Sequence, residues 1–236
     1  MPPEAQPNFQ PIPKPGFFLT FEGLDGSGKT TQIQRLKDTL EKSGIPVQIT
    51  RQPGGTEFGD KLRALLLDSK SSGIAPLAEL ALMFADRAQA IRQVIAPALE
   101  QPQVVLCDRF TDSTEAYQGG GRELGSEIVR ELHRLLCDDL QPDQTILLLP
   151  DLETSLYRAR RRNGSQEASK DEGRFEQERD AFFHRVQAKY VEIAEREPQR
   201  VTMIKGNLSL SAVRTRIEAE VIRRIKLHGF EPVATK

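Results

Sequence analysis

The chain has 236 residues, of which 38% are hydrophobic and 28% are charged, and its formal net charge is −1. This length fits one α/β domain with at most a small appendage, and the near-neutral charge gives no support for the bulk electrostatic attraction by which many proteins bind nucleic acids. No apolar run approaches the length of a membrane span, so we expect neither a nucleic-acid nor a membrane partner.

The two cysteines, Cys107 and Cys137, do not form a C-x-x-C pair, and the three histidines are scattered along the chain. These spacings argue against a structural zinc site, a histidine metal cluster and a Ser-His triad. Unpaired cysteines favour reduced thiols and a cytoplasmic location.

Short apolar runs alternate with helix-period segments almost to the end of the chain. The first 16 residues contain six prolines and few apolar side chains, so residues 1–16 are expected to form a disordered tail. In chain order, the predicted strands are Phe17–Glu22, Val47–Thr50, Val104–Asp108, Thr145–Leu149 and Val201–Ile204. Between them, one helical face carries Ile33, Leu36 and Leu40, and another carries Ile128, Leu132, Leu135 and Leu136.

Strands separated by helices predict a three-layer α/β fold, in which right-handed crossovers build a buried parallel sheet of about five strands flanked by helices. We expect this domain to span 17–228 and to be followed by a short tail at 229–236. Ligands of such sheets bind beyond the carboxyl ends of the strands. The loops that follow the strands are therefore where functional residues are expected.

The loop after the first predicted strand carries a phosphate-binding motif. Gly23-Leu24-Asp25-Gly26-Ser27-Gly28-Lys29-Thr30 fits G-x-x-x-x-G-K-[ST] and leads into an amphipathic segment that begins at Thr30 and continues with Thr31. A strand, a glycine-rich loop and a helix N-terminus in this order direct backbone N–H groups at an anion. We expect Lys29 to reach the β- and γ-phosphates and the Thr30 hydroxyl to ligate Mg²⁺. A chance glycine-rich turn is the alternative, which the flanking strand and helix disfavour.

Two further strand ends carry candidate ligands. Thr50–Thr56 places a Pro-Gly-Gly turn beside Arg51, which suits a loop whose backbone approaches a ligand, although an ordinary tight turn is favoured when this segment is taken alone. Asp108 closes the third predicted strand as a Walker-B carboxylate would, and is a second candidate for Mg²⁺. Arg109 follows it and fits either a bidentate contact to phosphate or an ion pair with Asp108.

A helical segment between these loops carries a candidate base-binding pair. Phe84 and Arg87 lie three residues apart, hence on one helical face, and combine an aromatic plane with a planar hydrogen-bond donor. Met83 and Phe84 fit core packing as well, which is the more frequent role of such residues on a helix.

The segment Asp108–Arg122 reads DRFTDSTEAYQGGGR. Together with the glycine-rich loop and Arg51–Thr56, this string resembles the bacterial-type thymidylate kinases of the P-loop nucleoside-monophosphate-kinase family, over roughly residues 17–227. The resemblance implies a P-loop NTPase fold with a helical or loop lid. It also implies transfer of the γ-phosphoryl group of ATP to dTMP with Mg²⁺, giving dTDP for dTTP synthesis. Members are usually homodimeric, and Leu80–Ile95 is the expected interface helix.

The resemblance also implies roles for individual residues. Asp25 contacts the region of the acceptor 3′-hydroxyl, and Arg109 holds the acceptor phosphate. Arg87 bonds the thymine carbonyl, and Tyr117 crowds the sugar C2′ position, so that ribonucleotides are excluded. The complete expected substrate-binding set is Arg51, Pro53, Arg63, Met83, Phe84, Arg87, Arg109, Ser113, Thr114, Tyr117 and Gln118.

A cationic segment is the candidate lid, at about residues 158–174. Four arginines cluster at Arg158–Arg162, a polar stretch rich in Gly, Ser and charge follows, and Arg174 begins the next helical segment. Such a run of arginines is most often a solvent-exposed helix face. In a phosphoryl-transfer protein, the run beside a polar loop also fits a closing lid. Ser27 gives the glycine-rich loop no arginine of its own. The family spacing favours Arg158, Arg162 and Arg174, which with Asp25, Lys29 and Arg109 form the expected catalytic set.

Three positions depart from the family pattern, one of them Pro150, which closes the fourth predicted strand where the family often has Asp. Gln52 stands where the family usually has Glu, which removes a negative charge beside the acceptor site. The stacking aromatic usually lies four residues before the base-reading arginine, where this chain has Met83, so either Met83 or Phe84 is the expected contact to thymine.

Other functions remain open at this point. Another nucleotide or small-metabolite kinase of the same fold is disfavoured by the Asp108–Gln118 string. A P-loop GTPase switch needs an N-K-x-D motif, and the chain has no Asn-Lys pair. A motor or assembly ATPase would leave the acceptor-site and lid arginines unexplained.

Overall fold

The computed structural model describes residues 15–71, 73–163, 174–175 and 178–230, and the structural statements below concern these ranges. Its centre is a five-stranded sheet with the order β2-β3-β1-β4-β5, in which every pairing is parallel. The strands are β1 (Phe17–Glu22), β2 (Val47–Arg51), β3 (Val104–Asp108), β4 (Gln144–Leu149) and β5 (Val201–Lys205). The predicted α/β fold is confirmed, and each predicted strand agrees with its observed bounds to within one residue.

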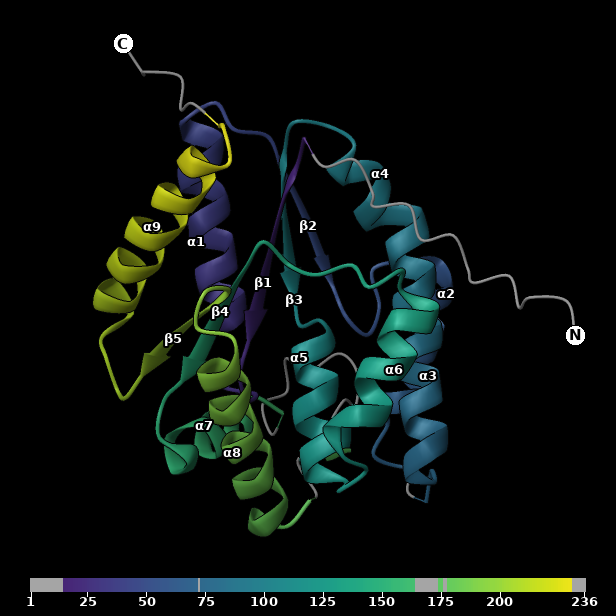
Figure 1. Cartoon of the computed structure of the whole chain (residues 1–236). Helices are drawn as coiled ribbons and strands as arrows, with labels where there is room; N and C mark the ends of the chain where they lie inside the picture. Colours follow the sequence, from purple (N-terminus) through teal and green to yellow (C-terminus); the bar gives the residue numbers. More distant parts are fainter. Residues whose placement is uncertain (1–14, 72, 164–173, 176–177, 231–236) are drawn as a thin grey trace, which may run out of the picture.

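Helices cover both faces of the sheet (Figure 1). The helices, in chain order, are α1 (Lys29–Lys42), α2 (Glu57–Leu67), α3 (Pro76–Ala90), α4 (Ala96–Leu99), α5 (Thr111–Thr114), α6 (Ser126–Leu136), α7 (Leu152–Asn163), α8 (Asp180–Arg196) and α9 (Leu210–Leu227). Two segments have the wider π-helical geometry, namely η1 (Ile91–Ile95), which joins α3 to α4, and η2 (Glu115–Gly121), which continues α5.

Alternation along β1 separates the two halves of the core. Phe17, Leu19 and Phe21 lie in a cluster with apolar residues of α1 and α9. Phe18 instead packs with residues of α3, η1, α4 and α6 on the opposite face. Side chains of a strand point alternately to the two faces of its sheet, so a buried strand without polar alternation, such as FFLTFE, supports a helical layer on both sides.

The apolar face predicted on α6 is only partly covered. Val129 and His133 are the buried residues of this helix, whereas Leu135 and Leu136 are each 49% exposed. Ile128 and Leu132 are partly buried. Helical periodicity identifies a face, but it does not say whether the chain itself covers that face.

The carboxyl ends of β1, β2 and β3 meet at one edge of the sheet, and the segments that follow them build the site described below. The predicted tails and the predicted lid fall largely outside the described residues, as 1–14, 164–173 and 231–236 do. Among the helices within the described ranges, none has both the length and the apolar character that crossing a membrane requires.

Candidate active site

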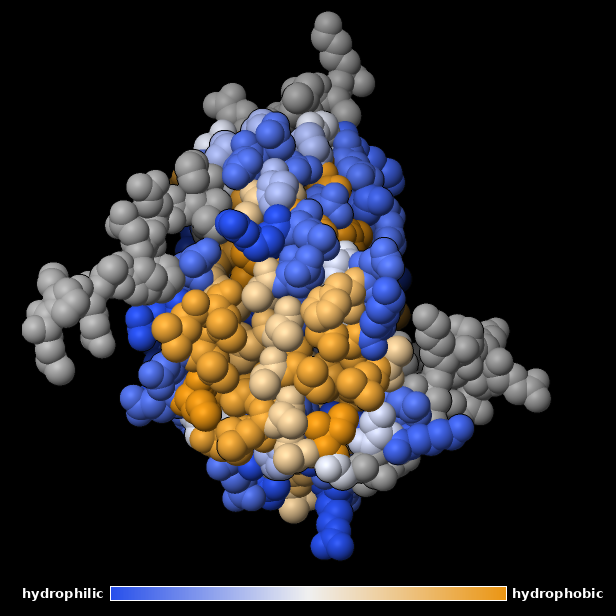
Figure 2. Space-filling model, turned by 90° about the vertical axis from the view of Figure 1, so that its right-hand side faces the viewer, coloured by the Kyte–Doolittle hydropathy of each residue, from blue (hydrophilic) through white to orange (hydrophobic). Residues whose placement is uncertain are grey.

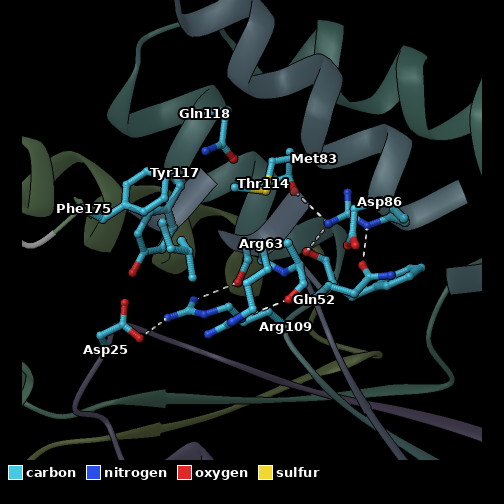
Figure 3. A pocket seen from close by; sticks show the side chains of 15 residues that line it. Asp25, Gln52, Arg63, Met83, Asp86, Arg109, Thr114, Tyr117, Gln118 and Phe175 are labelled. Atoms are coloured by element: carbon cyan, nitrogen blue, oxygen red, sulfur yellow. Dashed lines mark hydrogen bonds and ion pairs between the residues drawn. The ribbon is translucent and has the colours of Figure 1, made fainter. Parts of the chain in front are cut away.

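A pocket lies at this edge of the sheet, between α3, η2 and the loops that follow β1 and β2 (Figure 3). It is lined by Asp25, Gln52, Pro53, Arg63, Leu67, Met83, Asp86, Arg87, Arg109, Phe110, Ser113, Thr114, Tyr117, Gln118 and Phe175. Nine residues expected from the sequence to bind the substrate therefore line one cavity, and Asp25 lines it with them.

The glycine-rich loop folds tightly around the Lys29 side chain. The ammonium Nζ donates to the carbonyl oxygens of Gly23 and Leu24, both at 3.1 Å. Burial and the neighbouring charge of Arg109 lower the pKa of Lys29 to about 8. A nearby anion would restore the charged form, so a phosphate is a favourable ligand for this ammonium group.

The P-loop also packs against α7, which carries Arg158, the first arginine of the predicted lid. Gly26 adopts a φ of 77°, and a Cβ atom at this position would lie 2.3 Å from the carbonyl oxygen of Ser155 and 3.0 Å from Cβ of Arg158. Only glycine permits this approach without strain. Arg158 is thereby placed directly beside the loop that would hold phosphates.

The two residues predicted to bind Mg²⁺, Thr30 and Asp108, come together at the start of α1. The hydroxyl of Thr30 donates to Oδ2 of Asp108 at 3.4 Å. The other carboxylate oxygen, Asp108 Oδ1, is buried and has no hydrogen-bond partner among the described residues. A hydroxyl and a carboxylate oxygen are ligands that Mg²⁺ prefers, since it keeps several waters and takes its remaining ligands from phosphates. The residues present therefore fit this ion.

Arg109 joins the P-loop to the pocket. Its Nη2 lies 3.0 Å from Oδ1 of Asp25, and its Nη1 donates to Oγ of Ser113 at 3.0 Å. The guanidinium also lies over the Tyr117 ring, 5.2 Å from its centroid. Arg109 adopts a φ of 71°, a left-handed conformation that a non-glycine residue keeps only when its surroundings enforce it.

The enforcing group is Glu22, which sequence analysis missed. Its carboxylate is fully buried and accepts hydrogen bonds from the Phe110 backbone N–H at 2.7 Å and from the Ser113 hydroxyl. The Tyr190 hydroxyl donates to it at 3.3 Å. Burial, reinforced by the negative charge of Asp112, raises the pKa of Glu22 to about 7. A glutamate inside a buried strand, one residue before the P-loop, was the available signal.

Arg87 is held at the far side of the pocket. Its Nε donates to Oε1 of Gln52 at 2.7 Å, and its Nη2 donates to the Thr114 hydroxyl at 2.8 Å and to the Phe110 carbonyl at 3.1 Å. The remaining nitrogen, Nη1, and the amide nitrogen of Gln52 are buried and without a partner in the described part of the chain. Buried donors are rarely left unsatisfied, so these two indicate a polar ligand.

The structure decides between the two candidate stacking residues. Met83 lines the pocket. Phe84 is fully buried in the core with Phe18 and Phe110 and does not line it. Its ring lies beneath Arg87, 5.1 Å from the guanidinium carbon. The expectation that Phe84 contacts the substrate therefore does not match its position, because the packing of α3 turns this residue toward the sheet.

The other arginines predicted to bind substrate or to act in catalysis lie in different surroundings. Arg63 lines the pocket and donates to the Pro53 carbonyl at 2.9 Å. Arg51 is exposed and pairs with Asp60 at 3.2 Å, and it is not among the lining residues. Arg174 is buried in an ion pair with Glu79 at 2.7 Å, a position that does not match the predicted contact to the transferring phosphoryl group. The side chain of Arg162 lies outside the described residues.

Comparison with known proteins agrees with this geometry. A sequence model of the family described as thymidylate kinase matches residues 21–217. The chain is 46% identical to the thymidylate kinase of Pelobacter propionicus over 208 residues, which cover 88% of this chain and 94% of that protein. It is 43% identical to the thymidylate kinase of Geobacter sulfurreducens, over 89% of this chain and 98% of that protein.

A solved structure extends the similarity to the fold. The crystal structure of thymidylate kinase from Ehrlichia chaffeensis is 32% identical in sequence, with a TM-score of 0.66 over 89% of this chain and 98% of that one. The sequence matches and the shared fold lead to one conclusion. The chain belongs to the thymidylate kinase family.

Proposed function

We propose that this protein transfers the γ-phosphoryl group of ATP to dTMP, with the acceptor nucleotide in the pocket of Figure 3 and the donor phosphates on the P-loop. Family membership makes the chain a thymidylate kinase that serves dTTP synthesis. The observation that carries the site assignment is the position of Arg109, which reaches the P-loop carboxylate Asp25 at 3.0 Å and also lines the pocket.

In this assignment, Lys29 and the P-loop backbone bind the donor phosphates, and Arg109 binds the acceptor phosphate. Two anions that repel each other are thereby held in one place by fixed cations. The transition state of phosphoryl transfer is loose, so positioning and charge stabilisation supply most of the catalysis. Arg158, beside Gly26, is the predicted lid arginine that we assign to approach the transferring group.

Thr30 and Asp108 would hold Mg²⁺ beside the donor phosphates. The ion would offset the negative charge on the phosphate oxygens. A buried Asp108 oxygen without a partner in the described ranges supports this assignment.

The base would occupy the end of the pocket formed by Arg87, Thr114, Gln118 and Met83. Arg87 supplies a buried donor for a ring carbonyl, and Met83 offers a polarizable apolar surface to the ring. Tyr117 also lines the pocket and is 6% exposed. Its ring contacts Phe175 and Phe182 edge-on, so it is held rigidly where we expect the sugar C2′ atom.

An acceptor panel tests the proposal. Release of ADP from ATP is coupled to NADH oxidation, with dTMP, dUMP, dCMP, UMP, CMP and AMP as acceptors. We expect a preference for dTMP, and equal rates with all six would refute the substrate assignment. Lys29→Ala serves as the control for the donor site and should lower kcat by at least about 100-fold, since it removes a cation aimed at the phosphates.

We also propose that two copies of the chain associate through an apolar face. Figure 2 shows a broad hydrophobic surface on the side where α2, α3 and α6 lie in Figure 1. Its exposed members are Phe58 and Leu65 of α2, Leu77 of α3, and Leu135 and Leu136 of α6, each between 46% and 58% exposed. A monomer rarely exposes an apolar patch of this kind, and a closed dimer would bury one copy against the other. The predicted interface segment, Leu80–Ile95, lies partly on this face.

Light scattering after size exclusion tests the dimer. Leu77→Glu should convert a dimer into a monomer, because it places a carboxylate in the apolar face, where burial without a partner is costly. A wild-type protein that elutes as a monomer at micromolar concentration contradicts this proposal. We further propose a cytoplasmic location without nucleic-acid or membrane partners, which the near-neutral charge supports.

A further inference from the structure

Glu79 is a buried carboxylate at the base end of the pocket. It lies in α3 and is 0% exposed. Arg174 donates to its Oε2 at 2.7 Å, and Arg122 donates to the same oxygen at 3.2 Å. Its Oε1 accepts a hydrogen bond from the side-chain amide of Gln118 at 2.7 Å. Its guanidinium and amide partners all donate, so the carboxylate accepts every one of these hydrogen bonds.

This contact fixes the orientation of the Gln118 amide. A glutamine amide carries two donors on nitrogen and an acceptor on oxygen, and the two ends are interchangeable unless a neighbour distinguishes them. Because an ionised carboxylate only accepts, the nitrogen of Gln118 must face Glu79 and the oxygen must face away. Gln118 is 1% exposed and lines the pocket. In Figure 3 its oxygen is turned toward the side where Thr114 and Met83 lie.

The pocket thus has a defined hydrogen-bond polarity. Gln118 presents an acceptor, and Arg87 presents a donor through a buried Nη1 that has no partner among the described residues. An imide base such as thymine or uracil offers the complement, namely an N3–H donor beside an O4 acceptor. Cytosine offers the reverse at both positions, an N3 acceptor beside an N4 amino donor.

We propose that Glu79 is a positioning residue that selects imide pyrimidines over cytosine by holding the Gln118 oxygen toward the base. This inference rests on the proposed function, since it requires the acceptor base to lie in this pocket. A site built for one hydrogen-bond pattern rejects the opposite pattern strongly, because its buried groups are then left unpaired.

The test compares kcat/KM for dTMP, dUMP and dCMP in the wild type and in Glu79→Gln, at saturating ATP. A glutamine at position 79 can donate or accept, so it no longer dictates the orientation of Gln118. We expect the dTMP-to-dCMP preference to fall by about tenfold or more, mainly through KM, while the dTMP-to-dUMP ratio stays unchanged. A loss of packing alone would lower all three values by one common factor, and that result overturns the proposal.

The matched control is Glu178→Gln. Glu178 accepts from the same Arg122, at 2.6 Å, but no contact joins it to Gln118. It should leave the dTMP-to-dCMP preference at the wild-type value. A double-mutant cycle with Gln118→Met adds a further check, because the Glu79→Gln effect on this preference should vanish when position 118 has no amide. If it persists, Glu79 does not act through Gln118.

Glu79→Asp covers the case in which the glutamine variant does not fold. It retains the charge that Arg122 and Arg174 require, but its shorter side chain withdraws the carboxylate from Gln118. The dTMP-to-dCMP preference should fall in this variant too, and an unchanged value overturns the proposal. A wild-type enzyme without any preference for dTMP over dCMP would instead refute the substrate assignment, so the two failures are distinguishable.

Discussion

The buried carboxylate of Glu22 makes a quantitative prediction about stability and pH. Its pKa is raised from 4.5 to about 7, first by burial and then by the charge of Asp112. The folded protein therefore binds this proton more tightly than the unfolded chain does. Stability that comes from the protonated group is fully present at low pH and is lost as the pH rises toward 7.

The perturbation is Glu22→Gln, which removes the titration and keeps the size of the side chain. A glutamine oxygen can still accept from the Phe110 N–H, and its nitrogen can donate to the Ser113 and Tyr190 hydroxyls. At about 1.36 kcal/mol per pKa unit, the Glu22 shift corresponds to about 2.5 kcal/mol between pH 5 and pH 8. The stability of the variant minus that of the wild type should therefore increase by about this amount over the interval.

Urea unfolding at pH 5, 6, 7 and 8 measures this difference directly. All groups that titrate identically in the two proteins cancel from it, and equal m-values confirm that the two unfolding transitions expose similar surface. A difference that stays constant to within about 0.5 kcal/mol, or that falls as the pH rises, would refute the argument that burial dominates at Glu22.

Three further predictions follow from single positions. Gly26→Ala should lose more stability and more activity than Gly28→Ala in thermal unfolding and turnover assays. Both glycines have a positive φ, but only a Cβ atom at position 26 would contact neighbouring atoms, so equal losses would contradict this. Gln52→Glu should stabilise the fold by about 1–3 kcal/mol in urea unfolding, because it places a carboxylate against the buried Arg87. Destabilisation would show that the charge of Arg87 is already compensated. Tyr117→Ala should raise the kcat/KM for ribo-TMP relative to dTMP, whereas Tyr117→Phe should not. If the alanine variant rejects the ribonucleotide as strongly as the wild type does, the Tyr117 ring does not exclude ribonucleotides by steric contact.

Local patterns predicted the elements of this site well. The strand positions follow from apolar runs of the right length. The P-loop follows from a motif whose glycines and lysine all lie within one short segment of the chain. The strand ends of a parallel sheet lie at one edge, so Asp25, Arg109 and the Arg87 helix were expected to converge there. These conclusions depend on contacts between residues near in sequence, or on a general property of the fold.

The pairing of charged and polar groups could not be predicted in the same way. Arg174 was expected at the transferring phosphate, but it pairs with Glu79, which lies 95 residues away in the chain. Gln52 and Arg87 are separated by 35 residues. A run of arginines shows that cations are present, whereas their partners depend on which elements pack side by side.

The sequence by itself determined the fold class, the P-loop motif and most of the residues that line the pocket. The tertiary structure decided that Met83 rather than Phe84 faces the pocket, that the Phe110 N–H donates to Glu22, and that the Gln118 amide donates to Glu79. Helical and strand periods assign side chains to faces, but only packing decides which face meets the sheet, the pocket or the solvent. Buried polar groups must find partners wherever the fold supplies them, and such partners are distant in sequence.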